Sequence, residues 1–79
     1  MEQLVEIPKI QVIMAFVATC IESTARHLNI SYQEVYGRMK RVDMIERYII
    51  PHYESLHTES RDNIASGMIE CLNQWEKSR

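Results

Sequence analysis

The chain has 79 residues, 46% of them hydrophobic, and a net charge of −2, which exclude a disordered chain and argue against a dedicated nucleic-acid binder. Only two glycines and two prolines occur, too few for the tight turns of a small β protein. We therefore expect one domain over residues 1–79, with 1–7 as a flexible N-terminal tail, folded as an all-α compact bundle of four helices, two long (first and last) and two short.

The first helix should begin near Pro8 and end near Asn29, because proline suits the first helical position and asparagine the left-handed position after a helix. Its apolar residues lie almost all round the helix, which implies burial on more than one face. Three other helices in so small a fold cannot readily cover apolar side chains on every side of the first helix. An exposed apolar patch usually marks contact with another chain. We predict that this patch includes Val12, Met14, Phe16 and Trp75.

Two short helices should follow. Ser31 with Glu34 has the spacing of a capping box, and Val35, Tyr36 and Met39 would point inward from the helix that it opens. Asp43 with Glu46 repeats the spacing and predicts the start of a third helix. Pro51 disfavours helical geometry at the residue before it, so the third helix should stop near Ile50.

The stretch "PHYESLHTES" (residues 51–60) is rich in histidine and hydroxyl groups. His52 and His57 are five residues apart, which does not fit the spacing of a helical zinc site, and no HExxH motif or cysteine cluster accompanies them. A hydrolase would need Ser55 or Thr58 beside a histidine that a third group orients. The sequence contains no nucleophile elbow to accompany them. The pattern favours a structural joint, where Leu56 anchors the chain, His57 bonds backbone, and Thr58 or Ser60 caps the last helix.

The last helix should run from about Ser60 or Arg61 to Glu76, with a buried stripe that includes Ile64, Met68 and Leu72. Two cysteines, Cys20 and Cys71, fall inside apolar helical patterns and are expected as buried, reduced thiols.

No apolar run reaches the roughly 18 residues that span a bilayer, and the acidic N-terminus does not resemble a signal peptide. We expect a cytoplasmic protein that contacts no membrane.

A basic cluster around the second and third helices offers an alternative function. Its members are Arg38, Lys40, Arg41 and Arg47, and the two short helices could form a helix-turn-helix-like unit of a small DNA-binding regulator. Asp43 and Glu46 lie within the cluster, and cations also favour the C-terminal end of a helix. A solvated helix end is therefore the preferred interpretation, and nucleic-acid binding is the less favoured one.

Three motifs resemble those of a known family. They are "FVATCIE" with Phe16, Val17, Cys20, Ile21 and Glu22; "NIS" with Asn29, Ile30 and Ser31; and "YESLHT" with Tyr53, Leu56, His57 and Thr58. Together they resemble small bacterial proteins of the domain of unknown function family 3791. The resemblance implies an antitoxin-like or accessory partner of proteins that resemble ADP-ribosyltransferase toxins. The chain departs from the family at Ser66 and Gly67, where the closing helix is commonly acidic.

The residues and the resemblance lead to one functional expectation. No pattern in the chain supplies a catalytic group, a metal site or a cofactor site, so we expect a non-enzymatic protein–protein interaction module with no cofactor. Its partner would be a second copy of the chain, giving a homo-oligomer (a dimer), a toxin-like protein, or both.

Overall fold

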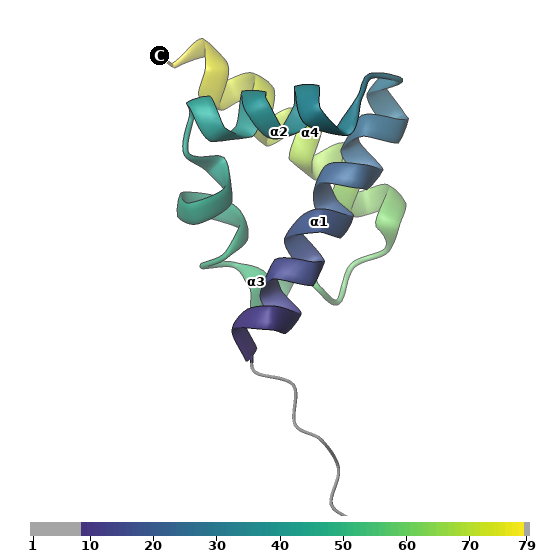
Figure 1. The fold of residues 1–79 in the computed structure, drawn as a ribbon, viewed down its shortest axis with the longest axis vertical. Coiled ribbons are helices and arrows are strands. Elements are labelled where there is room, and N and C mark those ends of the chain that lie inside the picture. The colour runs from purple at the N-terminus through teal and green to yellow at the C-terminus, as the bar shows by residue number, and fades with distance from the viewer. Residues whose placement is uncertain (1–8, 79) are drawn as a thin grey trace, which may run out of the picture.

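The computed structural model describes residues 9–78, and within that range every regular element is a helix. The elements are α1 (Lys9–Leu28), α2 (Tyr32–Arg41), the π-helical turn η1 (Ile45–Ile49), α3 (Tyr53–Leu56) and α4 (Arg61–Lys77) (Figure 1). The all-α class, with a long first and a long last helix, is confirmed. The predicted tail at residues 1–7 and the predicted helix start at Pro8 lie outside the described residues.

The end of α1 lies where the sequence predicts it. Asn29 has a φ of 58°, in the left-handed region that asparagine tolerates. Its N–H donates to the carbonyl oxygen of Arg26 at 3.2 Å, and the N–H of Ile30 donates to that of Ala25 at 3.1 Å. These two bonds satisfy carbonyl groups that the last turn leaves free. The chain turns sharply here, so α2 runs across the end of α1 (Figure 1).

The serine caps of α2 and α4 also agree with their sequence signals. Ser31 has extended backbone angles, and its Oγ accepts a hydrogen bond from the N–H of Glu34 at 3.0 Å. Of the two candidates for the last helix, Ser60 is the N-cap, and its Oγ accepts from the N–H of Asn63 at 3.2 Å. Each cap satisfies one of the backbone donors that the first helical turn leaves free.

The predicted capping role of Asp43 and Glu46 is wrong. Asp43 has a φ of 59°, and its N–H donates to the carbonyl oxygen of Lys40 at 3.1 Å, so this residue terminates α2. An N-cap requires extended backbone angles, which a left-handed residue does not have. Met44 already has α-helical angles, and η1 begins without a side-chain cap.

Two short elements connect α2 to α4. In η1 the N–H of Ile50 donates to the carbonyl oxygen of Ile45 at 3.0 Å, the wider i to i+5 spacing of a π-helix. This turn ends before Pro51, as predicted. The segment expected to be only a joint contains the four-residue helix α3, so the bundle has one more short helix than predicted. Leu56, at the end of α3, packs against the core.

The core lies between α1, α2, η1 and α4, and α1 packs against both α2 and α4. Its fully buried large side chains come from all four elements or their flanking turns: Ile21, Val35, Met39, Met44, Ile49, Met68 and Leu72. One polar residue, Thr24, is buried among them, and its hydroxyl donates to the carbonyl oxygen of Cys20 at 2.7 Å. This arrangement leaves one face of α1 in contact with the bundle and another open.

Candidate interaction surface

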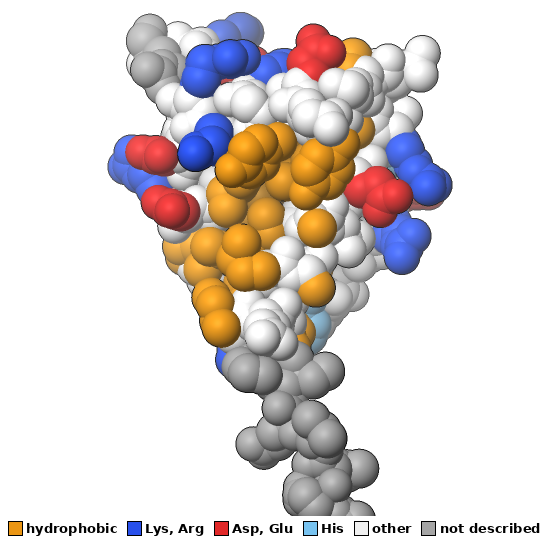
Figure 2. Space-filling view, viewed as in Figure 1, with side chains coloured by type: hydrophobic (Ala, Val, Ile, Leu, Met, Phe, Trp, Pro, Cys, Tyr) orange, Lys and Arg blue, Asp and Glu red, His pale blue; other side chains and the backbone are white. Residues whose placement is uncertain are grey.

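An apolar groove lies where α1, α2 and η1 meet. Its volume is about 410 Å³. Figure 2 shows hydrophobic side chains gathered in one patch on this face of the molecule. The groove is lined by apolar and tyrosine side chains and by three charged residues: Met14, Val17, Ala18, Ile21, Tyr32, Tyr36, Lys40, Asp43, Ile45, Glu46 and Ile50. We call this surface the apolar groove.

The N-terminal half of α1 extends the apolar surface beyond the groove. Ile10 is 57% exposed and Met14 is 45% exposed, and their i, i+4 spacing places them on one face of the helix. Further along α1 the side chains of Val17 and Ile21 are buried in the core. The helix therefore passes from an uncovered apolar half to a covered one, and the transition lies at the groove.

The four residues predicted to form the interaction patch do not lie on one surface. Met14 lines the groove, whereas Val12 is 37% exposed and is not among the groove residues. The Phe16 ring contacts Tyr53 edge to face, with centroids 5.3 Å apart. The Trp75 ring contacts Tyr48, with centroids 6.1 Å apart, and both pack against the core. Phe16 and Trp75 are both partly buried, so each packs against the core and keeps part of its ring at the surface, away from the groove.

Among the groove residues that sequence reasoning missed, the tyrosines of α2 are the large exposed ones. Tyr36 was predicted to point inward, but Tyr32 and Tyr36 are each 41% exposed and line the groove. The available signal was their i, i+4 spacing, which places both rings on one face of α2. The buried residues Val35 and Met39 have the same spacing three positions later, so the two pairs compete for the inward face and the aliphatic pair occupies it.

Three charged residues line the groove, and two of them are acidic. The Lys40 ammonium lies 5.8 Å from the centroid of the Tyr36 ring, within the range of a cation–π contact. Asp43 and Glu46 are exposed. Among the interactions of the residues that the structure describes, neither carboxylate takes part in a hydrogen bond or an ion pair. Asp43 and Glu46 therefore give the groove an acidic edge at and just before η1, with Lys40 in the groove and Arg41 and Arg47 beside Asp43 around the second hollow.

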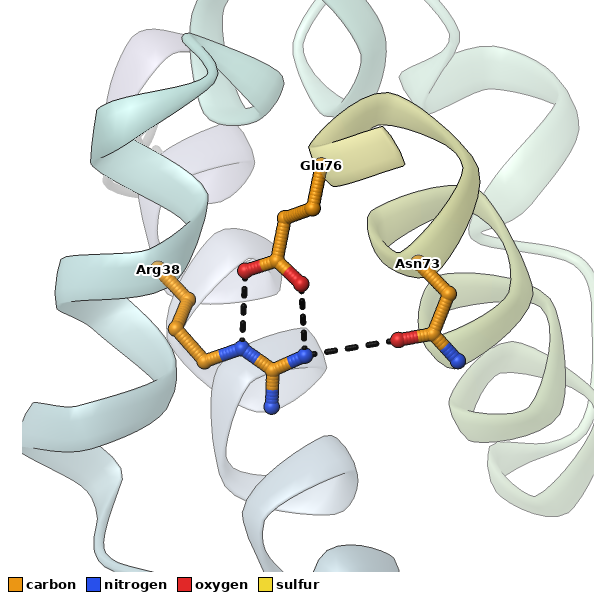
Figure 3. A network of polar contacts seen from close by, with 3 residues as sticks. All are labelled: Arg38, Asn73 and Glu76. Carbon is orange, nitrogen blue, oxygen red and sulfur yellow. Dashed lines mark hydrogen bonds and ion pairs between the residues drawn. The ribbon is translucent and has the colours of Figure 1, made fainter. Parts of the chain in front are cut away.

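Arg38 joins α2 to α4 instead of facing solvent with the rest of the basic cluster (Figure 3). Its Nε donates to one carboxylate oxygen of Glu76 at 2.9 Å, and one terminal nitrogen donates to the other at 2.8 Å. The same nitrogen donates to Oδ1 of Asn73 at 3.3 Å. These hydrogen bonds lower the pKa of the Glu76 carboxyl and raise the pKa of Arg38. The guanidinium of Arg38 therefore uses its donors to join two helices of the fold and not to bind a ligand.

The remaining members of the basic cluster occupy different places. Lys40 lies at the apolar groove, whereas Arg41 and Arg47 border a second hollow of about 360 Å³ beside Trp75. With Arg38 paired to Glu76, the four cations do not share one phosphate-binding surface. Duplex binding requires several cations to contact the backbone together. A DNA-binding role stays a prediction, and the observed placement does not favour it.

The residues of the joint pack against one another. The predicted side-chain bond from His57 to backbone is wrong, because the His57 ring stacks on Tyr53 with centroids 4.6 Å apart and an interplanar angle of 13°. The histidine beside a backbone acceptor is His52, whose Nδ1 lies 2.8 Å from the carbonyl oxygen of Tyr48. The Thr58 hydroxyl donates to the carbonyl oxygen of Ser55 at 2.9 Å, so that hydroxyl is turned toward backbone. Lys9 pairs with Glu54 and links the start of α1 to α3. This arrangement favours the structural interpretation of the stretch.

The two cysteines are both free thiols. Cys20 is fully buried, and burial raises its pKa to about 12. Cys71 is partly buried, and the same cause raises its pKa. Since the thiolate is the reactive form, both residues are poor nucleophiles near neutral pH.

Among the described helices, none has both the length and the apolar character needed to cross a bilayer.

Comparison with protein families gives one match. The family described as "Protein of unknown function (DUF3791)" matches residues 15–75. The chain belongs to this family. Comparisons with curated proteins and with solved structures gave no significant match. The DUF3791 match begins one residue after Met14 and ends at Trp75, so it includes most of the apolar groove but not Met14 or the exposed turn that carries Ile10.

Proposed function

We propose that this DUF3791 protein is a non-enzymatic interaction module, in the cytoplasm, that buries the apolar groove against another protein chain. The observation that supports the proposal is the continuity of the groove with the exposed stripe of α1, where Ile10 and Met14 are 57% and 45% exposed. Large contiguous apolar patches on small proteins generally mark a contact surface. Methionine and tyrosine, both present here, are enriched at such contacts.

The partner we favour is a toxin-like protein, for which the chain would act as an antitoxin-like or accessory protein. The family resemblance supports this choice, whereas the groove supports only the burial of apolar surface. A second copy of the chain is the other predicted occupant. The two are separated by light scattering at micromolar concentration, because a chain that is monomeric at that concentration excludes a second copy as the occupant of the groove.

Site-specific photo-crosslinking tests the proposal. A photoreactive phenylalanine derivative placed at Met14, in the groove, should give covalent adducts heavier than the chain itself when cells of its natural source are irradiated. The matched control places the same group at Glu70, which is exposed on α4 and does not line the groove. Adducts that form as often at position 70 as at position 14, or that do not form at position 14, would contradict the proposal.

A further inference from the structure

We infer that the apolar groove accepts one amphipathic α-helix of another protein, and that this helix carries lysine or arginine along the edge that faces Asp43 and Glu46. The inference rests on the proposed function and specifies the chemistry of the partner. Three observations lead to it: the composition of the groove, its length along α1, and the charges at its edge.

The composition of the groove favours a helix over an extended peptide. Its lining is mainly apolar, with the tyrosines Tyr32 and Tyr36 and three charged residues as its polar members. An extended peptide would bring unpaired backbone N–H and C=O groups against this surface, and within residues 9–78 there is no strand edge to pair with them. A helix satisfies its backbone internally and presents only side chains, as in other helix-in-groove complexes.

The length of the apolar surface fits about three helical turns. From Ile10 to Ile21, α1 supplies the exposed stripe and one wall of the groove. That distance is about 16 Å at 1.5 Å per residue. A docked helix of similar length would insert apolar side chains at i, i+3 or i+4, and i+7. Such a helix needs an apolar stripe on one face only, which leaves its edges available for charged residues.

The charges at the groove determine which sign of charge the edge of the docked helix should carry. Lys40 lies over the Tyr36 ring, and Arg41 and Arg47 line the second hollow, which Asp43 also borders. The exposed carboxylates of Asp43 and Glu46 make no ion pair within the described part of the chain, so both stay available to a partner. A basic edge on the incoming helix would pair with them, whereas an acidic edge would be repelled. Charges at the rim of an interface act mainly on specificity and association rate, which is the effect expected here.

A second copy of the chain fits the groove less well. The exposed large hydrophobic residues of the described chain are Ile10, Val12, Met14, Tyr32 and Tyr36. Apart from Val12, they lie on the groove or directly beside it, so a second copy would offer the same face that it has to cover. Two copies would have to meet groove to groove in a symmetric contact. Each groove carries two carboxylates and one ammonium, so two net acidic edges would come together.

Fluorescence anisotropy with a synthetic helical peptide tests the inference. The probe is a labelled peptide of about 14 residues (about 21 Å as a helix) with leucines along one face and lysines along one edge. Its twin carries glutamate in place of each lysine. We expect the lysine peptide to bind at least about tenfold more tightly, which corresponds to ~1.4 kcal/mol, and the difference to shrink as salt rises.

Variants of the protein show which residues cause the preference for the lysine peptide. Glu46→Lys should remove or invert the preference between the two peptides, whereas Glu70→Lys, the same change on α4, should leave it intact. Met14→Gln should weaken both peptides, and Val12→Gln, the same kind of change outside the groove, should weaken neither. Thermal unfolding followed by circular dichroism verifies that each variant is folded.

Some results would contradict the inferred basic helix without contradicting the proposed interaction function. Equal binding of the two peptides, unaffected by Glu46→Lys, would overturn the basic edge. No binding of either peptide would overturn the helical occupant. A dimer in light scattering that Met14→Gln dissociates would assign the groove to a second copy and overturn the inference. In each case the crosslinking at position 14 still decides independently whether the groove contacts another chain.

Discussion

At the scale of single residues, the pair Arg38–Glu76 makes the most specific polar contact between two helices. The two side chains are 24% and 30% exposed, and both carboxylate oxygens accept a hydrogen bond, which makes the pair stronger than an ordinary surface ion pair. We expect Glu76→Gln to lower the free energy of unfolding by about 1 kcal/mol at pH 7, measured by urea denaturation. Glu70→Gln, on the exposed face of α4, should leave it unchanged.

The same pair predicts a pH dependence. Hydrogen bonds from Arg38 lower the pKa of Glu76 below its ordinary value of 4.5. A carboxyl group with a lowered pKa in the folded state stabilises that state above its unfolded pKa and loses the contribution as the pH falls through its folded pKa. The difference in unfolding free energy between the natural chain and Glu76→Gln should therefore narrow below pH 4.5. A difference that stays constant down to about pH 3 would contradict the assignment.

Residue-level sequence reasoning succeeded where one local role was available and failed where two competed. Ser31 and Asn29 each had a single favourable position relative to a helix end, and the structure places them there. Asp43 lies at both the end of α2 and the start of the next helical segment, because its N–H donates to Lys40 and its carbonyl oxygen accepts from Arg47. Its left-handed backbone excludes the side-chain cap that the sequence predicted. Tyr36 fell on the boundary of the buried face, where only the packing of Val35 and Met39 decides its direction.

At the scale of elements, the two glycines weaken the helices that contain them. Neither has a positive φ, and a Cβ added to Gly37 or Gly67 would meet no heavy atom within 4 Å. We expect Gly37→Ala and Gly67→Ala each to raise the free energy of unfolding by about 0.5–1 kcal/mol, because glycine loses more backbone freedom on folding than alanine. Chemical denaturation monitored by circular dichroism measures the change.

A third alanine substitution serves as the contrast. Asn29→Ala should lower the free energy of unfolding by about 1 kcal/mol, because alanine is disfavoured at the φ of 58° that ends α1. The opposite signs distinguish a backbone effect from a general effect of adding alanine. Destabilisation by Gly37→Ala or Gly67→Ala would show that a neighbouring side chain needs the space at that glycine.

The long elements were predictable because many residues agree on them. The apolar periodicity of α1 and α4 repeats over several turns, so no single residue decides the assignment. By contrast, η1 depends on one i to i+5 bond between Ile50 and Ile45, and α3 is a four-residue turn. Elements this short are held by the tertiary packing of Leu56 and Tyr53 more than by local propensity. Sequence patterns therefore identified a joint there but not its helical turn.

At the scale of the whole molecule, the prediction that α1 has more apolar girth than the fold covers agrees with the exposure of Ile10, Val12 and Met14. The form of the uncovered surface was not predictable in the same way. The groove exists because the left-handed residues Asn29 and Asp43 set the directions of α2 and η1 relative to α1. Those directions emerge from packing, so sequence periodicity identified the excess apolar surface but not its neighbours.

An apolar groove that stays uncovered in the native state should bind an apolar fluorescent dye. We expect anilinonaphthalene sulfonate to bind the folded protein and Met14→Gln to weaken that binding, because Met14 lines the groove and is 45% exposed. The melting temperature should change by only a few degrees, since substitutions of exposed residues usually shift stability by less than about 0.5 kcal/mol. Fluorescence titration and thermal unfolding of the same samples measure both quantities.

Val12→Gln is the matched control for the dye experiment. Val12 is 37% exposed on the same helix, but it precedes Met14 by two residues and therefore lies nearly opposite it around the helix axis. Dye binding should survive this substitution if the groove is the site. Equal loss in both variants would instead mean that the dye reports general loosening of the first turns of α1, and the groove would then lose its status as a preformed apolar surface.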